Sequence, residues 1–137
     1  MFKAVWSIGR DGFDRIEALR RAAGISDACD STDAYAGHVY VCEETGEPIA
    51  AGRMYPDGDA LIIDRIAVMP QYDAMPYAEL VLRMLLFKAQ ELPQNDIRII
   101  CDESRFALVR RFGFAQSDAH TFTCSRNAIV WDSECRH

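Results

Sequence analysis

The chain has little of what marks a metal site or a disulfide framework. Its three histidines, His38, His120 and His137, show no spacing typical of zinc ligands. Its five cysteines are scattered, odd in number and form no CxxC motif: Cys29, Cys42, Cys101, Cys124 and Cys135. This pattern predicts reduced, mostly buried thiols and no structural metal site.

Long apolar runs and an excess of basic residues are also missing. No stretch reaches the roughly 18 to 20 apolar residues of a membrane-spanning helix, and the start, MFKAVWSIGRDGF, is unlike a signal peptide. The formal net charge of −6, without a basic patch of interleaved aromatics, argues against a nucleic-acid surface. We therefore expect a cytoplasmic protein that binds neither membranes nor nucleic acids.

What the chain does contain is enough apolar material for one folded domain. Hydrophobic residues make up 50% and charged residues 26% of its 137 positions. This balance is typical of globular proteins, and the length suits one core rather than two. The sequence predicts a single domain over 1–137.

In the first half, the hydrophobic pattern changes from one period to another. The apolar segment 2–8 predicts a strand, and apolar residues three and four apart from Phe13 predict a helix that Gly24 stops. Period-two segments at 38–43 and 48–55 predict a hairpin that turns at Gly46. The segment 60–69 continues as a third antiparallel strand.

In the second half, helices alternate with strands. An amphipathic helix is predicted from Tyr77 to Leu92, and a short one over 105–112. The apolar segment 97–101 predicts a strand that is buried on both faces and parallel to 60–69. The tail predicts two strands, at 120–124 and 128–131. The predicted fold class is α+β, with a mixed, mostly antiparallel twisted sheet and helices on both faces.

Three segments resemble motifs of the GCN5-related N-acetyltransferase (GNAT) superfamily. EPIAAGR at 47–53 resembles the family's P-V-A-x-G-R strand, RIAVMP at 65–70 resembles R-I-A-V-x-P, and RRFGF at 110–114 resembles E-K-L-G-F. Their order and separation match the family across most of the chain. The resemblance implies a GNAT-like fold and transfer of an acetyl group from acetyl-CoA to the amine of a small molecule or peptide. By analogy, it also suggests a homodimer.

The resemblance also implies which residues bind acetyl-CoA. The backbone of Ile66, Ala67 and Val68 corresponds to the strand that holds the pantetheine arm. Asp102 stands where the family often has an asparagine. The loop that wraps the pyrophosphate, with the family pattern R/Q-x-x-G-x-G/A, corresponds to Asp73, Ala74, Met75, Pro76, Tyr77 and Ala78.

This loop departs from the family pattern, because only Ala78 fits it. Asp73 replaces a basic or amide side chain, and a repulsion between two unit charges 4 Å apart is about 4 kcal/mol at an effective dielectric of 20. Pro76 replaces a glycine and removes an N–H that would bind phosphate. Starting the pattern at Gln71 instead restores its first side chain but not the glycines. Pro76 can still serve as the first residue (N1) of the helix that follows.

The catalytic positions differ as well. Val109 stands where the family often places a tyrosine that protonates the leaving thiolate, and valine has no proton to give. Asp64 is the only carboxylate on the inward face of the central strand and is our candidate general base. Its structural alternative is an ion pair with Arg53 or Arg65, or a bond to a turn amide.

Other residues also have two interpretations. His38 and His120 either orient substrate or are partly exposed structural residues at the starts of strands. Tyr77 either closes over a ligand or begins the apolar stripe of its helix, and Arg110 with Arg111 either contacts phosphate or forms a solvated face. For the whole chain, the alternative to an acetyltransferase is a GNAT-fold protein without acetyl transfer that binds another ligand or a partner.

Overall fold

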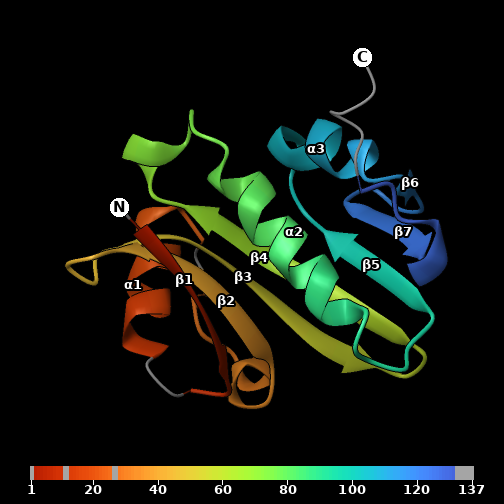
Figure 1. Ribbon diagram of the computed structural model, residues 1–137, viewed down its shortest axis with the longest axis horizontal. Helices are drawn as coiled ribbons and strands as arrows, with labels where there is room; N and C mark the ends of the chain where they lie inside the picture. The colour runs from red at the N-terminus through yellow and green to blue at the C-terminus, as the bar shows by residue number, and fades with distance from the viewer. Residues whose placement is uncertain (1, 11–12, 26–27, 132–137) are drawn as a thin grey trace.

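A computed structural model describes residues 2–10, 13–25 and 28–131, and within them seven strands form one twisted sheet (Figure 1). The strand order is β1-β2-β3-β4-β5-β7-β6. The strands are β1 (Phe2–Ile8), β2 (Gly37–Glu43), β3 (Pro48–Asp57), β4 (Ala60–Val68), β5 (Asp96–Ile100), β6 (Ala115–Gln116) and β7 (Thr121–Ser125). Among the described strands only the β4–β5 pair is parallel, so the predicted α+β class with a mostly antiparallel sheet is confirmed.

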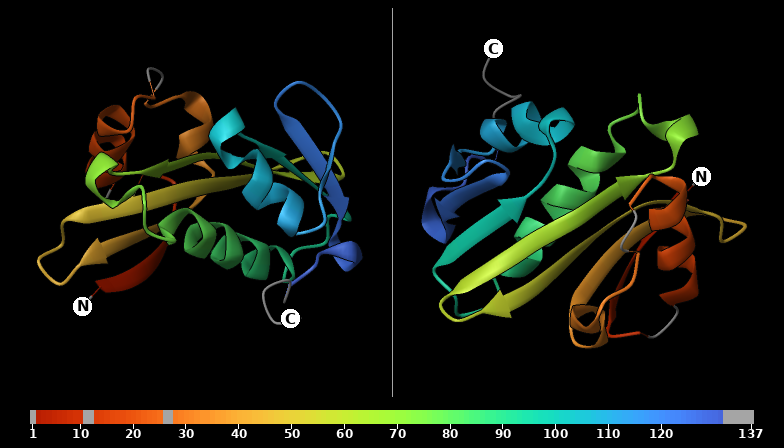
Figure 2. Two further views of the ribbon diagram at one scale, coloured as in Figure 1. Left: turned by 90° about the horizontal axis from the view of Figure 1, so that it is seen from above. Right: turned by 180° about the vertical axis from the view of Figure 1, so that it is seen from behind.

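The helices cover both faces of the sheet, as predicted. Helix α1 (Phe13–Ala22) lies on one face, and α2 (Tyr77–Ala89) with α3 (Phe106–Arg111) lies on the other (Figure 2). Four short 3-10 turns connect the described elements: η1 (Ser31–Ala34), η2 (Pro70–Tyr72), η3 (Glu103–Arg105) and η4 (Arg126–Ala128). No helix in the described ranges is long and apolar enough to cross a membrane.

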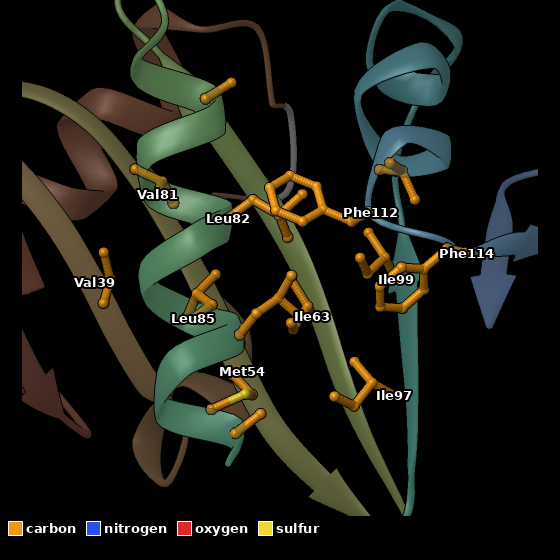
Figure 3. Packing of buried hydrophobic residues seen from close by; sticks show 14 of the residues in the cluster. Val39, Met54, Ile63, Val81, Leu82, Leu85, Ile97, Ile99, Phe112 and Phe114 are labelled. Atoms are coloured by element: carbon orange, nitrogen blue, oxygen red, sulfur yellow. The ribbon is translucent and has the colours of Figure 1, made fainter. Parts of the chain in front are cut away.

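The main core lies between α2 and the sheet. Val81, Leu82 and Leu85 of α2 are fully buried against strand residues that include Ile63 and Ile99 (Figure 3). The apolar stripe that predicted this helix is the face that makes these contacts. A smaller cluster lies under α1, where Ile16 and Leu19 pack against Ala51 and Ala67.

Gly52 on β3 explains how closely α2 approaches the sheet. A Cβ atom at this position would lie 2.7 Å from Val81 Cγ1 and 2.8 Å from Leu85 Cδ1. Both distances are too short for carbon atoms, so a side chain here would push the helix outward. The glycine of the GNAT-like strand motif is therefore required by packing.

The predicted hairpin and third strand are confirmed. Strands β2 and β3 pair from Gly37↔Met54 to Cys42↔Pro48, and Gly46 in the turn has a φ of 92°. Strand β3 then pairs antiparallel with β4. These pairings place the segment that resembles R-I-A-V-x-P in the middle of the sheet.

Four predictions of local structure were wrong. Helix α2 ends at Ala89, because the amides of 90–92 bond to carbonyls three residues back as the chain approaches Pro93. Strand β5 is not buried on both faces, since its residues alternate between exposed and buried. Pro76 is the N-cap of α2 rather than its first residue.

The fourth error concerns the tail. Segment 128–131 is not a strand: Ile129 is buried in the main core, and Val130 N–H donates to the Phe112 carbonyl at the end of α3. Trp131 stacks on Phe87 of α2, with ring centroids 4.9 Å apart. The alternation of this segment fits its packing across α2 and α3. The second tail strand is β6 instead.

Candidate active site

The parallel strands β4 and β5 separate halfway along β4. They pair from Ala60↔Asp96 to Ile63↔Ile99, and β5 then pairs with β7 alone (Figure 1). A cavity of about 490 Å³ opens where they separate. Its lining combines the second half of β4, the turn after it, the segment after β5 and the end of α1: Ala23, Ile25, Asp64, Arg65, Ile66, Ala67, Val68, Pro70, Asp73, Ile100, Cys101, Asp102, Ser104 and Arg105.

A bulge in β4 shapes this cleft. The register with β3 shifts between Arg53↔Asp64 and Ala51↔Ala67, so two residues of β4 lie opposite the single residue Gly52. Arg65 has a φ of 54°, which is rare for a bulky side chain. Such a bulge bends the strand and redirects its side chains. Asp64 and Arg65, although adjacent, both bond to the charged cluster described below.

Beyond the bulge, β4 presents backbone groups to the cleft. Met69 N–H donates to the Ile49 carbonyl on β3 at 2.8 Å. Because residues alternate between bonding one neighbour and the other along a strand, Val68 directs its N–H and C=O away from β3. That side is the one β5 has left.

A cluster of buried ion pairs forms one wall of the cleft. The guanidinium of Arg53 on β3, 2% exposed, donates to both Asp64 oxygens at 2.8 Å. It also donates to Asp30 at 2.7 Å and to Asp33 at 3.2 Å. Burial lowers the pKa of Arg53, but bonds and charges from Asp64 and Asp30 outweigh it and raise that pKa above the ordinary value.

Two further arginines complete this cluster. Arg20 on α1 donates to both oxygens of Asp33, at 3.0 and 3.1 Å, and Arg65 donates to Asp30 at 2.9 Å. Burial raises the pKa values of Asp30 and Asp33. For Asp30 the bond and charge of Arg53, and for Asp33 the bond from the Asp30 amide and the charge of Arg20, outweigh burial and hold both pKa values below the ordinary value. Residues 30–33 are therefore fixed to β3 and β4 by charge.

His38 lies beside this cluster and is fully buried, so its predicted partial exposure was wrong. Its Nε2 is 3.4 Å from the Asp33 carbonyl oxygen, and its ring packs edge-on against Phe13. Burial lowers the pKa of His38, and the nearby positive charges of Arg20 and Arg53 add to this. The ring is a neutral structural residue outside the cleft.

The loop after β4 uses several of its own amides. Tyr72 N–H donates to Met69, Asp73 N–H to Pro70 and Met75 N–H to Tyr72. The Tyr72 hydroxyl donates to the Glu43 carboxylate, a hydrogen bond that raises the pKa of Tyr72. These bonds tie the loop to itself and to β2.

One ion pair joins the two walls of the cleft. Arg105 of η3 donates from Nη2 to Asp73 Oδ1 at 3.2 Å. Beside it, Asp102 caps η3 by accepting from Ser104 N–H at 3.1 Å. Cys101 also lines the cleft, and burial raises the pKa of its thiol to about 11. Because this thiol stays protonated at neutral pH, it is a poor nucleophile.

The structure brings together about half of the predicted site residues. Asp64, Ile66, Ala67, Val68, Asp73 and Asp102 line the cleft. Ala74, Met75, Pro76, Tyr77 and Ala78 are not among its lining residues, although they lie between Asp73 and α2. Asp64 makes the ion pair with Arg53 that its structural alternative predicted, and its role as a base stays a prediction.

The remaining candidates lie elsewhere. Val109 is fully buried in the main core, and Tyr77 packs against that core as the start of the apolar stripe. Arg110 bonds to Gln116 and Arg111 to Glu79, and neither lines the cleft. His120 is exposed, with its Nδ1 3.1 Å from the Cys101 carbonyl oxygen.

The predicted burial of the cysteines is confirmed for two of the four that the structure describes. Cys42 and Cys124 are buried, Cys29 and Cys101 are half-buried, and all four are free. Cys135 lies outside the described residues. Across the described residues, no group of three or more metal-ligating side chains is suitably placed for a metal ion.

Sequence reasoning missed several residues of the cleft. Arg65 and Arg105 stand out here because of a bulge and a contact across two loops, and neither feature has a sequence signal of its own. Ala23 and Ile25 follow the first helix and reach the cleft only through the fold. The Asp64–Arg53 pair was anticipated, but the bond from Arg53 to Asp30 joins residues of separate segments, and spacing along the chain does not reveal it.

The class of this protein follows from a family model described as "Acetyltransferase (GNAT) family", which matches residues 7–114. The match covers most of the chain. The protein therefore belongs to the GNAT family of acyltransferases, as the three sequence motifs indicated.

Solved structures share the fold of this chain. A probable acetyltransferase from meticillin-resistant Staphylococcus aureus is 24% identical, with a TM-score of 0.71 over 86% of this chain and 92% of that one. An acyl-CoA N-acyltransferase from Pseudomonas aeruginosa is 12% identical, with a TM-score of 0.77 over 90% of this chain and 97% of that one.

A third similar structure is N-acetylglutamate synthase from Neisseria gonorrhoeae, described as complexed with coenzyme A and L-arginine. It is 14% identical, with a TM-score of 0.66 over 89% of this chain and 33% of that one. A sequence search of curated proteins found no match. At these identities, the structural similarities establish the fold alone.

Proposed function

We propose that this protein transfers an acetyl group from acetyl-CoA to a primary amine. The observation that carries the proposal is the gap in the sheet. Strand β4 continues beyond Ile63 without a β5 partner and directs the backbone of Val68 toward the side where the cleft opens. A free strand edge binds an extended, amide-containing chain as an added strand would, and the pantetheine arm is such a chain.

The residues around the gap fit this ligand in part. The backbone of Ile66, Ala67 and Val68 would hold the pantetheine arm, and the segments that contain Asp73 and Asp102 flank the opening. The loop 74–78 precedes α2, whose first turn has amides without intrahelical partners. A thioester bound here supplies an activated acetyl carbonyl.

The proposed reaction is direct attack by a neutral amine on the carbonyl carbon of the thioester. The new C–N bond forms, the C–S bond breaks, and the CoA sulfur leaves with the bonding electron pair. The amine gives up one proton, and Asp64 is our candidate acceptor, directly or through water. Two of its lone pairs are used by Arg53, which leaves two sites free for a proton.

The acceptor is proposed to approach from the α1 side of the cleft. Ala23 and Ile25, just after α1, form part of the lining, and the ion-paired cluster holds the next segment in place. A rigid wall here would position the amine close to the thioester, and positioning of this kind lowers the barrier substantially.

The test is acetyl transfer to a panel of amines. Purified protein is incubated with acetyl-CoA and polyamines, amino acids, aminoglycosides or peptides, and acetylated product is measured by mass spectrometry alongside free thiol. We expect one class of acceptor to yield product and thiol in equal amounts. Matched tertiary N,N-dimethyl amines, which cannot form a neutral amide, serve as controls. Thiol release without acetylated product in every reaction would contradict amine transfer.

A further inference from the structure

The ion pair between Asp73 and Arg105 joins the two sides of the cleft where a cofactor would enter. Asp73 follows β4 through η2, and Arg105 follows β5 in η3, so the pair spans the separation between the two strands. Both residues line the cleft. Their side chains are 59% and 20% exposed.

The loop on the Asp73 side has few groups to offer an anion. Pro76 has no N–H, and the amides of Tyr72, Asp73 and Met75 donate to carbonyls of 69–72. The amides at the start of α2 remain, and a cation beside them would add charge-assisted hydrogen bonds to phosphate groups.

The cleft lining holds two such cations, and they differ in what surrounds them. The Arg65 guanidinium donates to Asp30 within the buried cluster. Arg105 instead bonds to the exposed carboxylate of Asp73. An exposed ion pair is weak and is screened by salt, so Arg105 can exchange its partner at little cost.

We propose that Arg105 binds the pyrophosphate of acyl-CoA, and that Asp73 holds the guanidinium in the unliganded protein until the cofactor displaces it. This inference rests on the proposed function. A guanidinium binds phosphate oxygens through parallel N–H bonds, and the pyrophosphate carries more charge than one carboxylate. The exchange therefore favours the cofactor, while the displaced Asp73 stays close and weakens its binding.

The two members of the pair thus have opposite effects on cofactor affinity. Removing the charge of Asp73 should tighten binding, because the competing and repelling carboxylate is gone. Removing the charge of Arg105 should weaken binding. A pair that merely stabilises the fold would show the same sign for both changes.

The experiment measures the Kd of CoA by calorimetry for wild type, Asp73→Asn and Arg105→Gln. We expect binding about fivefold tighter for Asp73→Asn and about tenfold weaker for Arg105→Gln, the latter equivalent to about 1.4 kcal/mol. Glu17→Gln and Arg21→Gln are matched controls, because these residues form an ion pair on the surface of α1, away from the cleft. Their Kd values should equal that of wild type.

Two related ligands identify the group that Arg105 contacts. Dephospho-CoA keeps the pyrophosphate and lacks the 3′-phosphate. The ratio of its Kd for each cleft variant to its Kd for wild type should therefore be the same as for CoA. S-acetylpantetheine has no pyrophosphate, so its kcat/KM as a donor should be unchanged in both cleft variants. Ratios that vanish with dephospho-CoA, or that persist with S-acetylpantetheine, would overturn the assignment to pyrophosphate.

The proposal and the proposed function fail in different ways. If Arg105→Gln binds CoA as wild type does, or Asp73→Asn binds it more weakly, the exchange is wrong while acetyl transfer by wild type still stands. If neither wild type nor any variant binds CoA or transfers acetyl, both are wrong. Melting temperatures measured for each variant confirm that the compared proteins are folded.

Discussion

At the scale of single residues, the cleft wall is a set of carboxylates with different surroundings. Asp33 is fully buried and bonds to Arg20 and Arg53, whereas Asp64 is partly exposed, bonds to Arg53 and lines the cleft. Both belong to one cluster, so both are expected to contribute to stability. Only Asp64 is placed to meet a substrate, and this difference separates a catalytic role from a structural one.

We predict that Asp64→Asn lowers kcat by about a hundredfold or more, as expected for loss of a general base. Asp33→Asn is the matched control: it removes the same charge from the same cluster, and its kcat at a temperature where it is folded should stay near wild type. Steady-state kinetics and urea unfolding of both variants provide the comparison. If Asp64→Asn keeps the wild-type kcat, Asp64 is not the general base and only forms an ion pair with Arg53.

His38 gives the cluster a dependence on pH. It is packed by Asp33 of η1, by Phe13 and Arg20 of α1 and by Arg53 of β3. Because burial lowers its pKa in the folded state, the unfolded chain binds a proton at His38 more readily. Stability should therefore fall as the pH drops below about 6.5, the ordinary pKa of histidine.

Asp30 and Asp33 affect the stability of the fold in a different pH range. The pKa values of Asp30 and Asp33 are lowered, so the stability they contribute is complete above about 3.9, the ordinary value. It is lost as the pH falls through their lower folded-state values.

We predict that His38→Gln makes the free energy of unfolding nearly independent of pH between 5 and 6.5. The loss of stability below pH 4, which comes from the carboxylates, should stay as in wild type. Urea unfolding that shows equal slopes in wild type and variant would refute this role.

At the scale of elements, the cleft follows from how β4 is built. The bulge at Arg65 bends the strand after its paired half, and the residues beyond it bond to β3 while leaving their other side open. Helix α2 holds β3 from the opposite face through its close approach at Gly52. The open edge is thus supported by a rigid sheet, which suits it to bind an extended ligand.

We predict that Val68→Pro raises the KM for acetyl-CoA about tenfold, the effect of losing one hydrogen bond of about 1.4 kcal/mol. Proline removes the N–H that points toward the cleft, and it is tolerated on a strand edge that makes no ladder bond on that side. Val68→Ala is the control, since it loses side-chain packing but keeps the amide. Equal KM values in the two variants would show that the amide does not contact the cofactor.

At the scale of the whole molecule, strong periodic patterns predicted the fold well. The helix stripe of α2, the hairpin at Gly46 and the parallel strand β5 all depend on local periodicity or turn chemistry, and all three are confirmed. Segment 128–131 was mistaken for a strand because alternation there reflects packing between α2 and α3, whereas the strand predicted at 120–124 is confirmed as β7. Alternation shows which side chains are buried, but not which element buries them.

The site was harder to predict because most of its contacts join distant segments. Asp64 and the 66–68 backbone were identified from one strand and do line the cleft. The Asp73–Arg105 pair joins residues 32 positions apart in the sequence, and the Asp30–Arg53 pair joins residues 23 positions apart. Such contacts depend on the fold, and a single sequence has no local signal for them.

The most direct test of the account is a calorimetric titration of wild-type protein with acetyl-CoA. We predict saturable binding of one molecule per chain with a Kd below about 1 mM, in the range of typical enzyme substrates. Absence of binding at millimolar acetyl-CoA would contradict the account. If binding then appeared in an Asp73→Arg, Pro76→Gly double variant, the result would favour a GNAT-fold protein that uses this cleft for another ligand or partner.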